Sequence, residues 1–188
     1  MDNPNTIIQN NNLKNMLSKF RSIIGLLLLS GLLSVLSPRF LTHSNLFNVL
    51  RQTSLNAIIA VGMTFVILTG GIDLSVGSIL AFSGAVAANL AHNDGSATVA
   101  ILMGLVIGTI LGLLNGLIVT QGSVPPFIAT LAMMTMARGA TLVYSNGQPI
   151  TGLGDGFYFI GNGYIGQIPF PVIITIVALL VAYYILSQ

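Results

Sequence analysis

The stretch Thr69-Gly70-Gly71-Ile72-Asp73-Leu74-Ser75-Val76-Gly77-Ser78 interrupts an otherwise apolar run that extends from residue 55 to residue 90. Asp73 is the only charged residue of that run. Glycine adopts the left-handed conformation without steric cost, so Gly70-Gly71 can end a helix. Asp73 and Ser75 are both favoured N-cap residues, and Asp73 can cap the free N–H groups of a second helix. The stretch therefore predicts a helix broken at Gly70-Gly71 and a second helix that begins at about Leu74.

The amino-acid composition is that of an integral membrane protein. Hydrophobic residues make up 54% of the 188 residues and charged residues 5%, whereas a soluble domain carries ~25% charged residues. The apolar runs are long and do not alternate with polar residues, which favours helices over barrel strands. The six Lys and Arg residues are too few for a nucleic-acid surface. Cysteine is absent and the two histidines are isolated, so we expect no metal site.

The apolar segments predict an all-α integral membrane protein, a polytopic helical bundle with about six membrane segments. Residues 1–19 are polar and Asn-rich and predict a cytoplasmic tail, and residues 20–188 form the predicted membrane domain. The segment of residues 145–167 is rich in glycine and predicts a re-entrant or external loop. The expected apolar segments are residues 22–37, 55–68 with an amphipathic start from residue 46, 76–90, 97–119, 127–144 and 168–186.

The positions of Lys and Arg predict the orientation in the membrane. Lys14, Lys19 and Arg21 put the N-terminal tail on the cytoplasmic side. The loops at residues 92–96 and 145–167 then fall outside, and neither of them has a Lys or Arg. Arg39 and Arg51 argue against this orientation, because the loop that carries them falls outside too.

One face of the segment 97–119 is made of glycine. Gly104, Gly108, Gly112 and Gly116 recur every four residues, so they lie on one side of a helix. Small residues in such a row let the backbone of another helix approach closely. We interpret this glycine ridge as a helix-packing surface, and a wall of a solute path is the alternative.

Four polar residues lie within apolar segments. Asp73 is an ionisable group in apolar sequence; we interpret it first as a structural helix cap, with a functional site as the alternative, and the two roles are compatible. Arg138 lies about three residues, or ~4.5 Å, beyond the middle of its span. We expect it in a buried ion pair, with Asp73 as one of few possible partners; contact with a solute or a lipid head group is the alternative. Asn56 and Asn115 are neutral, and interhelical hydrogen bonds are their simplest role.

These considerations define a set of candidate residues and exclude catalysis. The sequence holds no nucleophile–base pair, and it lacks the Gly-x-x-x-x-Gly-Lys-Ser/Thr motif with which P-loop proteins bind ATP. We therefore expect no enzyme, no catalytic residue and no cofactor bound by this chain. The candidates for a translocation path or a structural break are Gly70, Gly71, Asp73, Ser75, Asn56 and Arg138.

Several segments resemble the membrane permease subunit of bacterial ABC sugar importers. The most specific match is Gly71-Ile72-Asp73-Leu74-Ser75-Val76-Gly77-Ser78. The resemblance covers nearly the whole chain from about residue 20 and is strongest to the members that import D-ribose. Gly70 departs from the family pattern, in which serine is usual at this place. Further matches are Asn45-Leu46-Phe47-Asn48-Val49-Leu50-Arg51-Gln52-Thr53-Ser54, Phe127-Ile128-Ala129-Thr130-Leu131, Arg138-Gly139 and Val143-Tyr144-Ser145-Asn146-Gly147.

The resemblance implies a membrane permease component of an ATP-driven importer for ribose or a related monosaccharide, in the bacterial inner membrane. It implies three partners: a second permease copy, a cytoplasmic ATP-binding cassette subunit that holds the ATP, and a periplasmic sugar-binding protein. Members of the family continue for almost as long again beyond the point that matches Gln188, so the chain resembles their N-terminal part. Two alternatives stay open: a truncated membrane protein that does not transport, and a proton-coupled secondary transporter.

Overall fold

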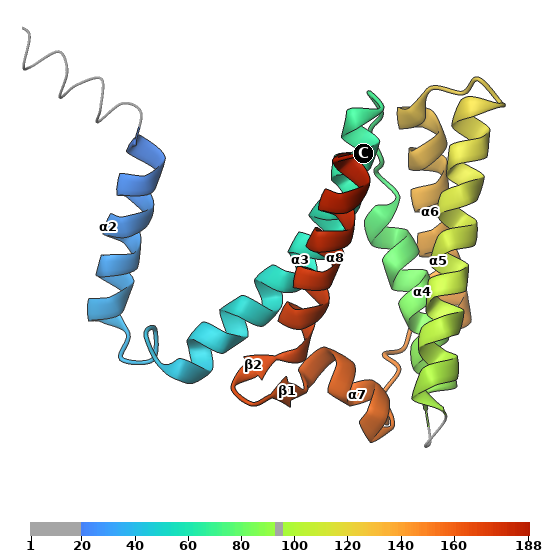
Figure 1. Ribbon diagram of the computed structural model, residues 1–188. Coiled ribbons are helices and arrows are strands. Elements are labelled where there is room, and N and C mark those ends of the chain that lie inside the picture. Colours follow the sequence, from blue (N-terminus) through green and yellow to red (C-terminus); the bar gives the residue numbers. More distant parts are fainter. Residues whose placement is uncertain (1–19, 93–95) are drawn as a thin grey trace, which may run out of the picture. The chain divides into compact units, whose positions relative to one another are not determined.

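The computed structural model describes residues 20–92 and 96–188, and this part of the chain is almost entirely helical (Figure 1). The predicted tail of residues 1–19, and residues 93–95 of the predicted outer loop at residues 92–96, lie outside the described residues. The all-α prediction is confirmed, because the one sheet in the described part is a two-stranded hairpin. The elements are α2 (Arg21–Leu36), α3 (His43–Leu68), α4 (Val76–Leu90), α5 (Ala97–Thr120), α6 (Pro126–Tyr144), α7 (Asp155–Asn162), β1 (Tyr164–Ile165), β2 (Ile168–Pro169) and α8 (Phe170–Leu186).

The six apolar helices lie where the sequence predicts them. Their ends differ from the expected ones by at most two residues, apart from the earlier start of α3. Three of them, α3, α5 and α6, are long and apolar enough to cross a membrane individually. The other three, α2, α4 and α8, have 16, 15 and 17 residues. At 1.5 Å per residue they measure roughly 22–26 Å, which is less than the ~30 Å hydrocarbon core of a bilayer.

The chain divides into two compact units, Met1–Val49 and Leu50–Gln188. In the first unit, α2 is apolar around its whole circumference, and none of its residues is buried. A helix that is apolar on every side is typical of a membrane span.

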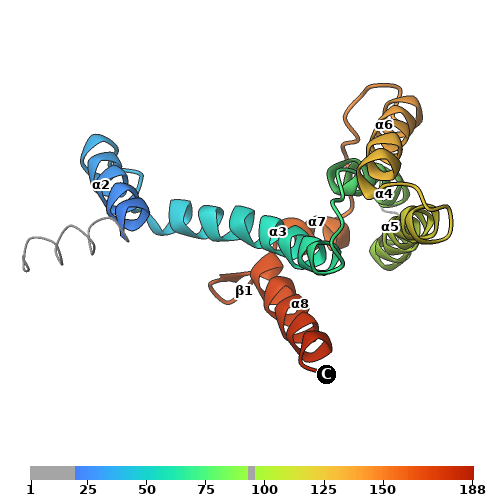
Figure 2. The same cartoon turned by 90° about the horizontal axis from the view of Figure 1, so that it is seen from above.

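In the second unit, α4, α5 and α6 lie side by side in both views (Figures 1 and 2). The contact between α4 and α6 is built on the buried residues Ile79, Met133 and Ala137. Phe82 of α4 extends it, with its ring 6.2 Å from that of Tyr144 in an edge-to-face arrangement. These three helices therefore form a packed group with its own apolar core.

The segment at residues 145–167, which the sequence predicts as a loop, contains α7 and β1, and β2 follows directly after it. Gly166 joins the two strands at a φ of +63°, which glycine adopts without strain. The segment also contacts the end of α4, because the N–H of Gly154 donates to the carbonyl oxygen of Ala91 at 2.9 Å. The loop prediction was incomplete because a helix of 8 residues and strands of 2 residues are shorter than the windows of about 11–18 residues over which periodicity identifies an element.

Hydrogen bonds join α3 to the last part of the chain. The guanidinium Nη1 of Arg51 donates to Oδ1 of Asn162 at 2.7 Å, and Oγ1 of Thr175 donates to the carbonyl oxygen of Ser54 at 2.9 Å. Arg51 thus contacts the segment that the orientation prediction puts outside.

Candidate functional site

The break between α3 and α4 begins with a helix C-terminus made by glycine. Gly70 has a φ of +75°, and its N–H donates to the carbonyl oxygen of Ile67 at 2.9 Å. The N–H of Gly71 donates to the carbonyl oxygen of Val66 at 3.0 Å. This pair of bonds is the Schellman motif, which requires a left-handed residue where Gly70 lies. The structure confirms that the helix is broken at Gly70-Gly71.

Asp73 organises the start of α4. Its Oδ1 accepts a hydrogen bond from the backbone N–H of Ser75 at 2.7 Å and another from the Ser75 hydroxyl at 2.6 Å. The carbonyl oxygen of Ser75 in turn accepts from the N–H groups of Ser78 and Ile79. Helix α4 begins at Val76, about two residues later than expected, because the turn closed by Asp73 occupies the residues before it.

Side chains of α5 and α6 complete the hydrogen bonding of the break. Asn115 Nδ2 donates to Ser75 Oγ at 2.7 Å, and Thr130 Oγ1 donates to the carbonyl oxygen of Ile72 at 3.3 Å. Ser75 is 0% exposed, Thr130 3% and Asn115 6%. Non-helical backbone at membrane depth is tolerated where protein surrounds it or where it lines a water-filled cavity. The break meets this requirement in part, because Ser75 is buried against α5 and the rest of the break borders a cavity.

The cavity beside the break has a volume of about 280 Å³. This is just below the ~300–1,000 Å³ of typical small-molecule pockets. Its wall is mainly apolar, with a few polar groups that come from the break, α5 and α6. The lining residues are Val66, Thr69, Gly71, Ile72, Asp73, Gly112, Asn115, Gly116, Val119, Thr120, Pro126 and Thr130.

The glycine ridge of α5 has two parts with different surroundings. A Cβ added to Gly104 would lie 3.2 Å from the Cβ of Ala87, and one added to Gly108 would lie 4.0 Å from Ser83 Oγ, both on α4. Gly112 and Gly116 have no such neighbour within 4 Å, and both line the cavity. One half of the ridge therefore faces α4 closely, while the other half leaves the space that the cavity occupies.

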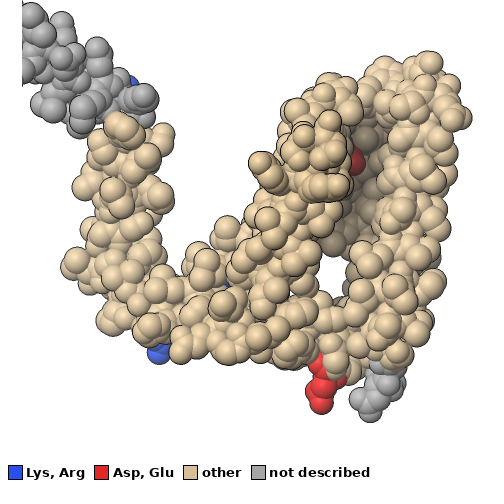
Figure 3. Space-filling model, viewed as in Figure 1, with Lys and Arg blue, Asp and Glu red and all other residues tan. Residues whose placement is uncertain are grey.

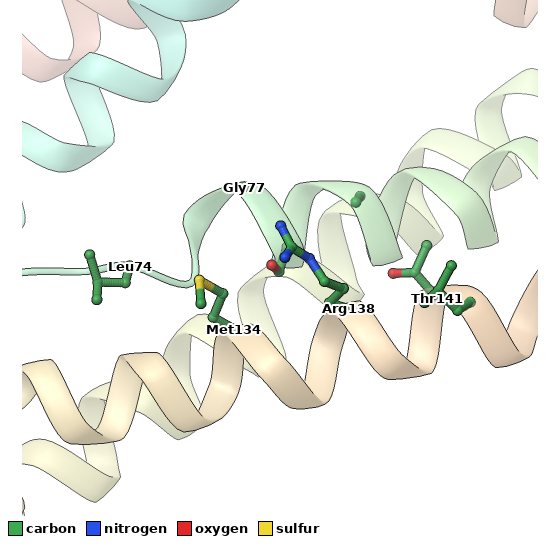
Figure 4. A pocket seen from close by; sticks show the side chains of 8 residues that line it. Leu74, Gly77, Met134, Arg138 and Thr141 are labelled. Atoms are coloured by element: carbon green, nitrogen blue, oxygen red, sulfur yellow. The ribbon is translucent and has the colours of Figure 1, made fainter. Parts of the chain in front are cut away.

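The buried ion pair expected for Arg138 is wrong. Arg138 is exposed, and no ion pair joins it to Asp73 in the part of the chain that the structure describes. It lines a different cavity of about 370 Å³, together with Leu74, Gly77 and Thr141 (Figure 4). Asp73 borders the cavity on α5 and directs Oδ1 at Ser75, so the two charges belong to separate sites.

The structure does not bring all the candidate residues together. Gly71, Asp73 and Ser75 meet at the break, but Asn56 is exposed on α3 and lies outside both cavities. Sequence analysis recognised the interhelical hydrogen bond of Asn115 but not its place at the break, and it gave Thr130 no role. A signal for Asn115 was present, since it shares a helix face with Gly112 and Gly116.

The fold and the site define a class: a multi-pass helical membrane protein with polar groups gathered at a broken helix, an arrangement typical of transporters. The surface seen in Figure 3 is almost free of charged side chains, as expected of such a protein. Residues 45–188 match the family described as "Branched-chain amino acid transport system / permease component", and the chain belongs to this family. The description of this family is that of a transport permease component.

Several curated proteins of this family are similar to the chain. The ribose import permease of Haemophilus influenzae is 50% identical over 172 residues, which cover 89% of this chain and 53% of that protein. The ribose import permease of Bacillus subtilis is 49% identical over 174 residues, covering 92% and 54%. The L-arabinose ABC transporter permease of Azospirillum brasilense is 36% identical over 162 residues, covering 86% and 48%. The chain spans about half the length of these relatives, and no solved structure matches it.

Proposed function

We propose that the chain forms part of the membrane path of an ATP-driven importer for ribose or a related monosaccharide. The observation that carries this proposal is the hydrogen-bonded break beside a cavity, in a chain that is 50% identical in sequence to a ribose import permease over 172 residues. Polar groups on an otherwise apolar wall can exchange hydrogen bonds with sugar hydroxyls and with water. Such weak, replaceable bonds suit a path that has to release its solute.

The residues of the break are the best-supported candidates for this path. Gly70 and Gly71 keep side chains away from the break, and Asp73 and Ser75 hold its backbone in place. The role of Asp73 is mainly structural, since its Oδ1 accepts both bonds from Ser75. Arg138 belongs to the second cavity, and Asn56 gains no support from its exposed position.

The importer also requires partners. We propose a second permease copy, a cytoplasmic ATP-binding cassette subunit and a periplasmic sugar-binding protein, in the bacterial inner membrane with the N-terminus in the cytoplasm. The ATP is then held by the separate subunit. The many exposed apolar side chains of the described helices fit a chain that is surrounded by lipid and by other membrane segments.

Ribose uptake tests the proposal in cells that lack their own ribose permease but keep the ATP-binding subunit and the sugar-binding protein. The chain is produced alone and, in parallel, continued by the second half of the Haemophilus influenzae permease. We expect ATP-dependent uptake of D-ribose with the continued chain.

Two outcomes would contradict the proposal. A continued chain that reaches the membrane in normal amount without any uptake would indicate a protein that does not transport. Uptake that a protonophore abolishes while cellular ATP is maintained would indicate a proton-coupled transporter. Competition by L-arabinose and D-allose would show how closely the path is restricted to ribose.

A further inference from the structure

A groove lies between α4 and α6 on the side that carries Arg138. Its first part is the cavity of about 370 Å³ that Arg138 lines, and its second part is a cavity of about 290 Å³. Ala81 and Thr141 line both cavities, so the two adjoin. We call this surface the α4–α6 groove.

The α4 side of the groove is made of small residues. Gly77, Ala81 and Ala85 line it and recur every four residues, so they lie on one face of the helix. Gly77 and Ala81 are exposed, and a Cβ added to Gly77 would meet no atom within 4 Å. Such a row lets the backbone of another helix approach closely. The described residues leave the space in front of it unfilled.

Two polar side chains of the groove lack partners. The Arg138 side chain extends from α6 toward Gly77 of α4 (Figure 4), and no described residue forms a hydrogen bond or ion pair with it. Ser78 lines the same cavity and is 7% exposed, and its hydroxyl has no hydrogen bond within the described part of the chain. The hydroxyl oxygen is nevertheless accessible to water. Buried hydroxyls are normally hydrogen-bonded, and cations at membrane depth are normally paired.

The chemistry of these two side chains restricts what occupies the groove. A guanidinium only donates hydrogen bonds, and its planar fork matches the two oxygens of a carboxylate. The same carboxylate can accept from the hydroxyl of Ser78. An occupant that fits both the small residues and the two donors is a membrane helix that carries an acidic side chain.

A second copy of this chain does not supply such a helix. The sequence has four acidic residues, Asp2, Asp73, Asp94 and Asp155, and none of them lies in α2, α3, α4, α5, α6 or α8. The curated relatives are about twice as long as the part of them that the chain matches. Their remaining half is therefore the source that fits.

We propose that the α4–α6 groove is the docking site for a membrane helix from the remaining half of the permease, and that a carboxylate of this helix pairs with Arg138 and accepts a hydrogen bond from Ser78. The small residues of α4 bring the two backbones close, and the ion pair fixes the depth and rotation of the docked helix. The inference goes beyond the proposed function, because it concerns the assembly of the permease and is independent of the solute.

Exchange of the two charges tests the inference in the continued chain. Arg138→Glu places two carboxylates together, so thermal unfolding in detergent should occur at least about 5 °C below the wild type. Each Asp or Glu in an apolar segment of the second half is then replaced by Lys in this variant, one at a time. One replacement should restore unfolding to within about 2 °C of the wild type, because it forms the pair again with its charges exchanged.

Ala81→Leu is a second test, which keeps the inference falsifiable even if Arg138→Glu does not fold. The added side chain fills the groove without a change of charge. It should leave the isolated chain as stable as the wild type, since Ala81 is exposed, and lower the unfolding temperature of the continued chain by displacing the docked helix. Ala132→Leu is the matched control, because Ala132 is exposed on α6 and lines neither cavity.

Several results would overturn the inference. A continued chain with Arg138→Glu that is as stable as the wild type would show that no carboxylate faces Arg138. Restoration by Lys at one of the four Asp residues of this chain would assign the carboxylate to residues 1–188 or to a second copy. Equal effects of Ala81→Leu and Ala132→Leu on the continued chain would show that the groove is not occupied.

Failure of every Lys replacement to restore stability would also overturn the inference. If phosphatidylglycerol then stabilised the wild type but not Arg138→Glu, the partner of Arg138 would be a lipid phosphate. All these measurements are made without transport, so an absence of ribose uptake would contradict the proposed function alone.

Discussion

Asp73 and Arg138 are both charged residues in apolar stretches of the sequence, but their surroundings in the structure differ. Asp73 has two hydrogen bonds from Ser75, and the break around it is joined to α5 by Asn115 and to α6 by Thr130. Arg138 is exposed, and the described residues offer it no ion pair. Residues of this chain therefore supply hydrogen-bond partners for Asp73, whereas the described residues supply no ion-pair partner for Arg138.

This difference separates two kinds of charged residue in a membrane protein. The break is a site that the chain stabilises by its own contacts, so substitutions there should already affect the isolated chain. An arginine at the centre of a membrane helix costs about 2.5–3.5 kcal/mol by insertion measurements, which water or an acceptor has to offset. For Arg138 such a group has to come from outside the described residues.

Replacement of Asp73 should give the largest effect. Asp73→Leu removes the acceptor for the N–H and the hydroxyl of Ser75, which is 0% exposed. Each buried donor left unpaired costs about 1–3 kcal/mol, so thermal unfolding of the purified chain in detergent, followed by circular dichroism, should occur at a clearly lower temperature. Asp73→Asn keeps an oxygen acceptor and should unfold close to the wild type. Equal unfolding temperatures for all three proteins would show that the break does not depend on this cap.

The two parts of the glycine ridge should respond differently to the same substitution. Gly104→Leu places a side chain where even a Cβ would be 3.2 Å from Ala87, and such overpacking costs about 1–3 kcal/mol. Gly108→Leu should have an intermediate effect, since its nearest neighbour on α4 lies at 4.0 Å. Gly112→Leu extends into the cavity, so the continued chain should stay abundant while its ribose uptake falls. Equal abundance of all three variants would contradict a packing role for the first part of the ridge.

Thr130 should contribute less than Asp73 or Gly104. Thr130→Val removes a hydroxyl whose single proton is shared between the carbonyl oxygen of Pro126 in its own helix, at 2.8 Å, and that of Ile72 at the break, at 3.3 Å. Loss of the bond to the break should lower the free energy of unfolding by about 1 kcal/mol. Thr135→Val, on the same helix, is the control, because the Thr135 hydroxyl is exposed and bonds only within α6. Equal effects of the two variants would mean that the bond to Ile72 adds nothing.

The contrast between Asp73 and Arg138 also shows how far the sequence could predict this site. The broken helix was predictable, because glycine conformation is a local property. Asp73 was predicted to cap free N–H groups of the second helix, but it accepts from the N–H and the hydroxyl of Ser75, the N-cap residue, whose own side chain makes no capping bond. The bond of Asn115 to Ser75 spans 40 residues and that of Thr130 to Ile72 spans 58. Contacts over such separations depend on how α4, α5 and α6 pack, which local patterns do not encode.

The error about Arg138 has the same physical origin. Its depth in α6 could be estimated from the sequence, but the direction in which its side chain leaves the helix relative to Asp73 could not. That direction follows from the contact of α4 with α6 through Ile79, Met133 and Ala137. The six apolar helices, in contrast, could be predicted almost to the residue, because the membrane selects for long apolar segments regardless of how they pack.

Replacement of Arg138 should have the smallest effect on the isolated chain. Arg138→Met keeps a long, flexible side chain with a similar helix propensity and removes the charge. Since the described residues give Arg138 no ion pair to lose, the free energy of unfolding of the purified chain should change by less than about 0.5 kcal/mol. Met133→Ala on the same helix is the reference, because Met133 is 5% exposed in the α4–α6 core and its loss should cost about 2–5 kcal/mol.

The same substitution should act strongly once the importer is assembled. If a second copy or a further membrane segment supplies the acceptor for Arg138, then Arg138→Met should reduce ribose uptake by the continued chain while the isolated chain stays as stable as the wild type. The isolated Arg138→Met variant could instead unfold at as low a temperature as Met133→Ala. This result would contradict the difference that we draw between Asp73 and Arg138. Such a result would show that the partner of Arg138 lies within residues 1–188. Both Asp73 and Arg138 would then have their partners within this chain.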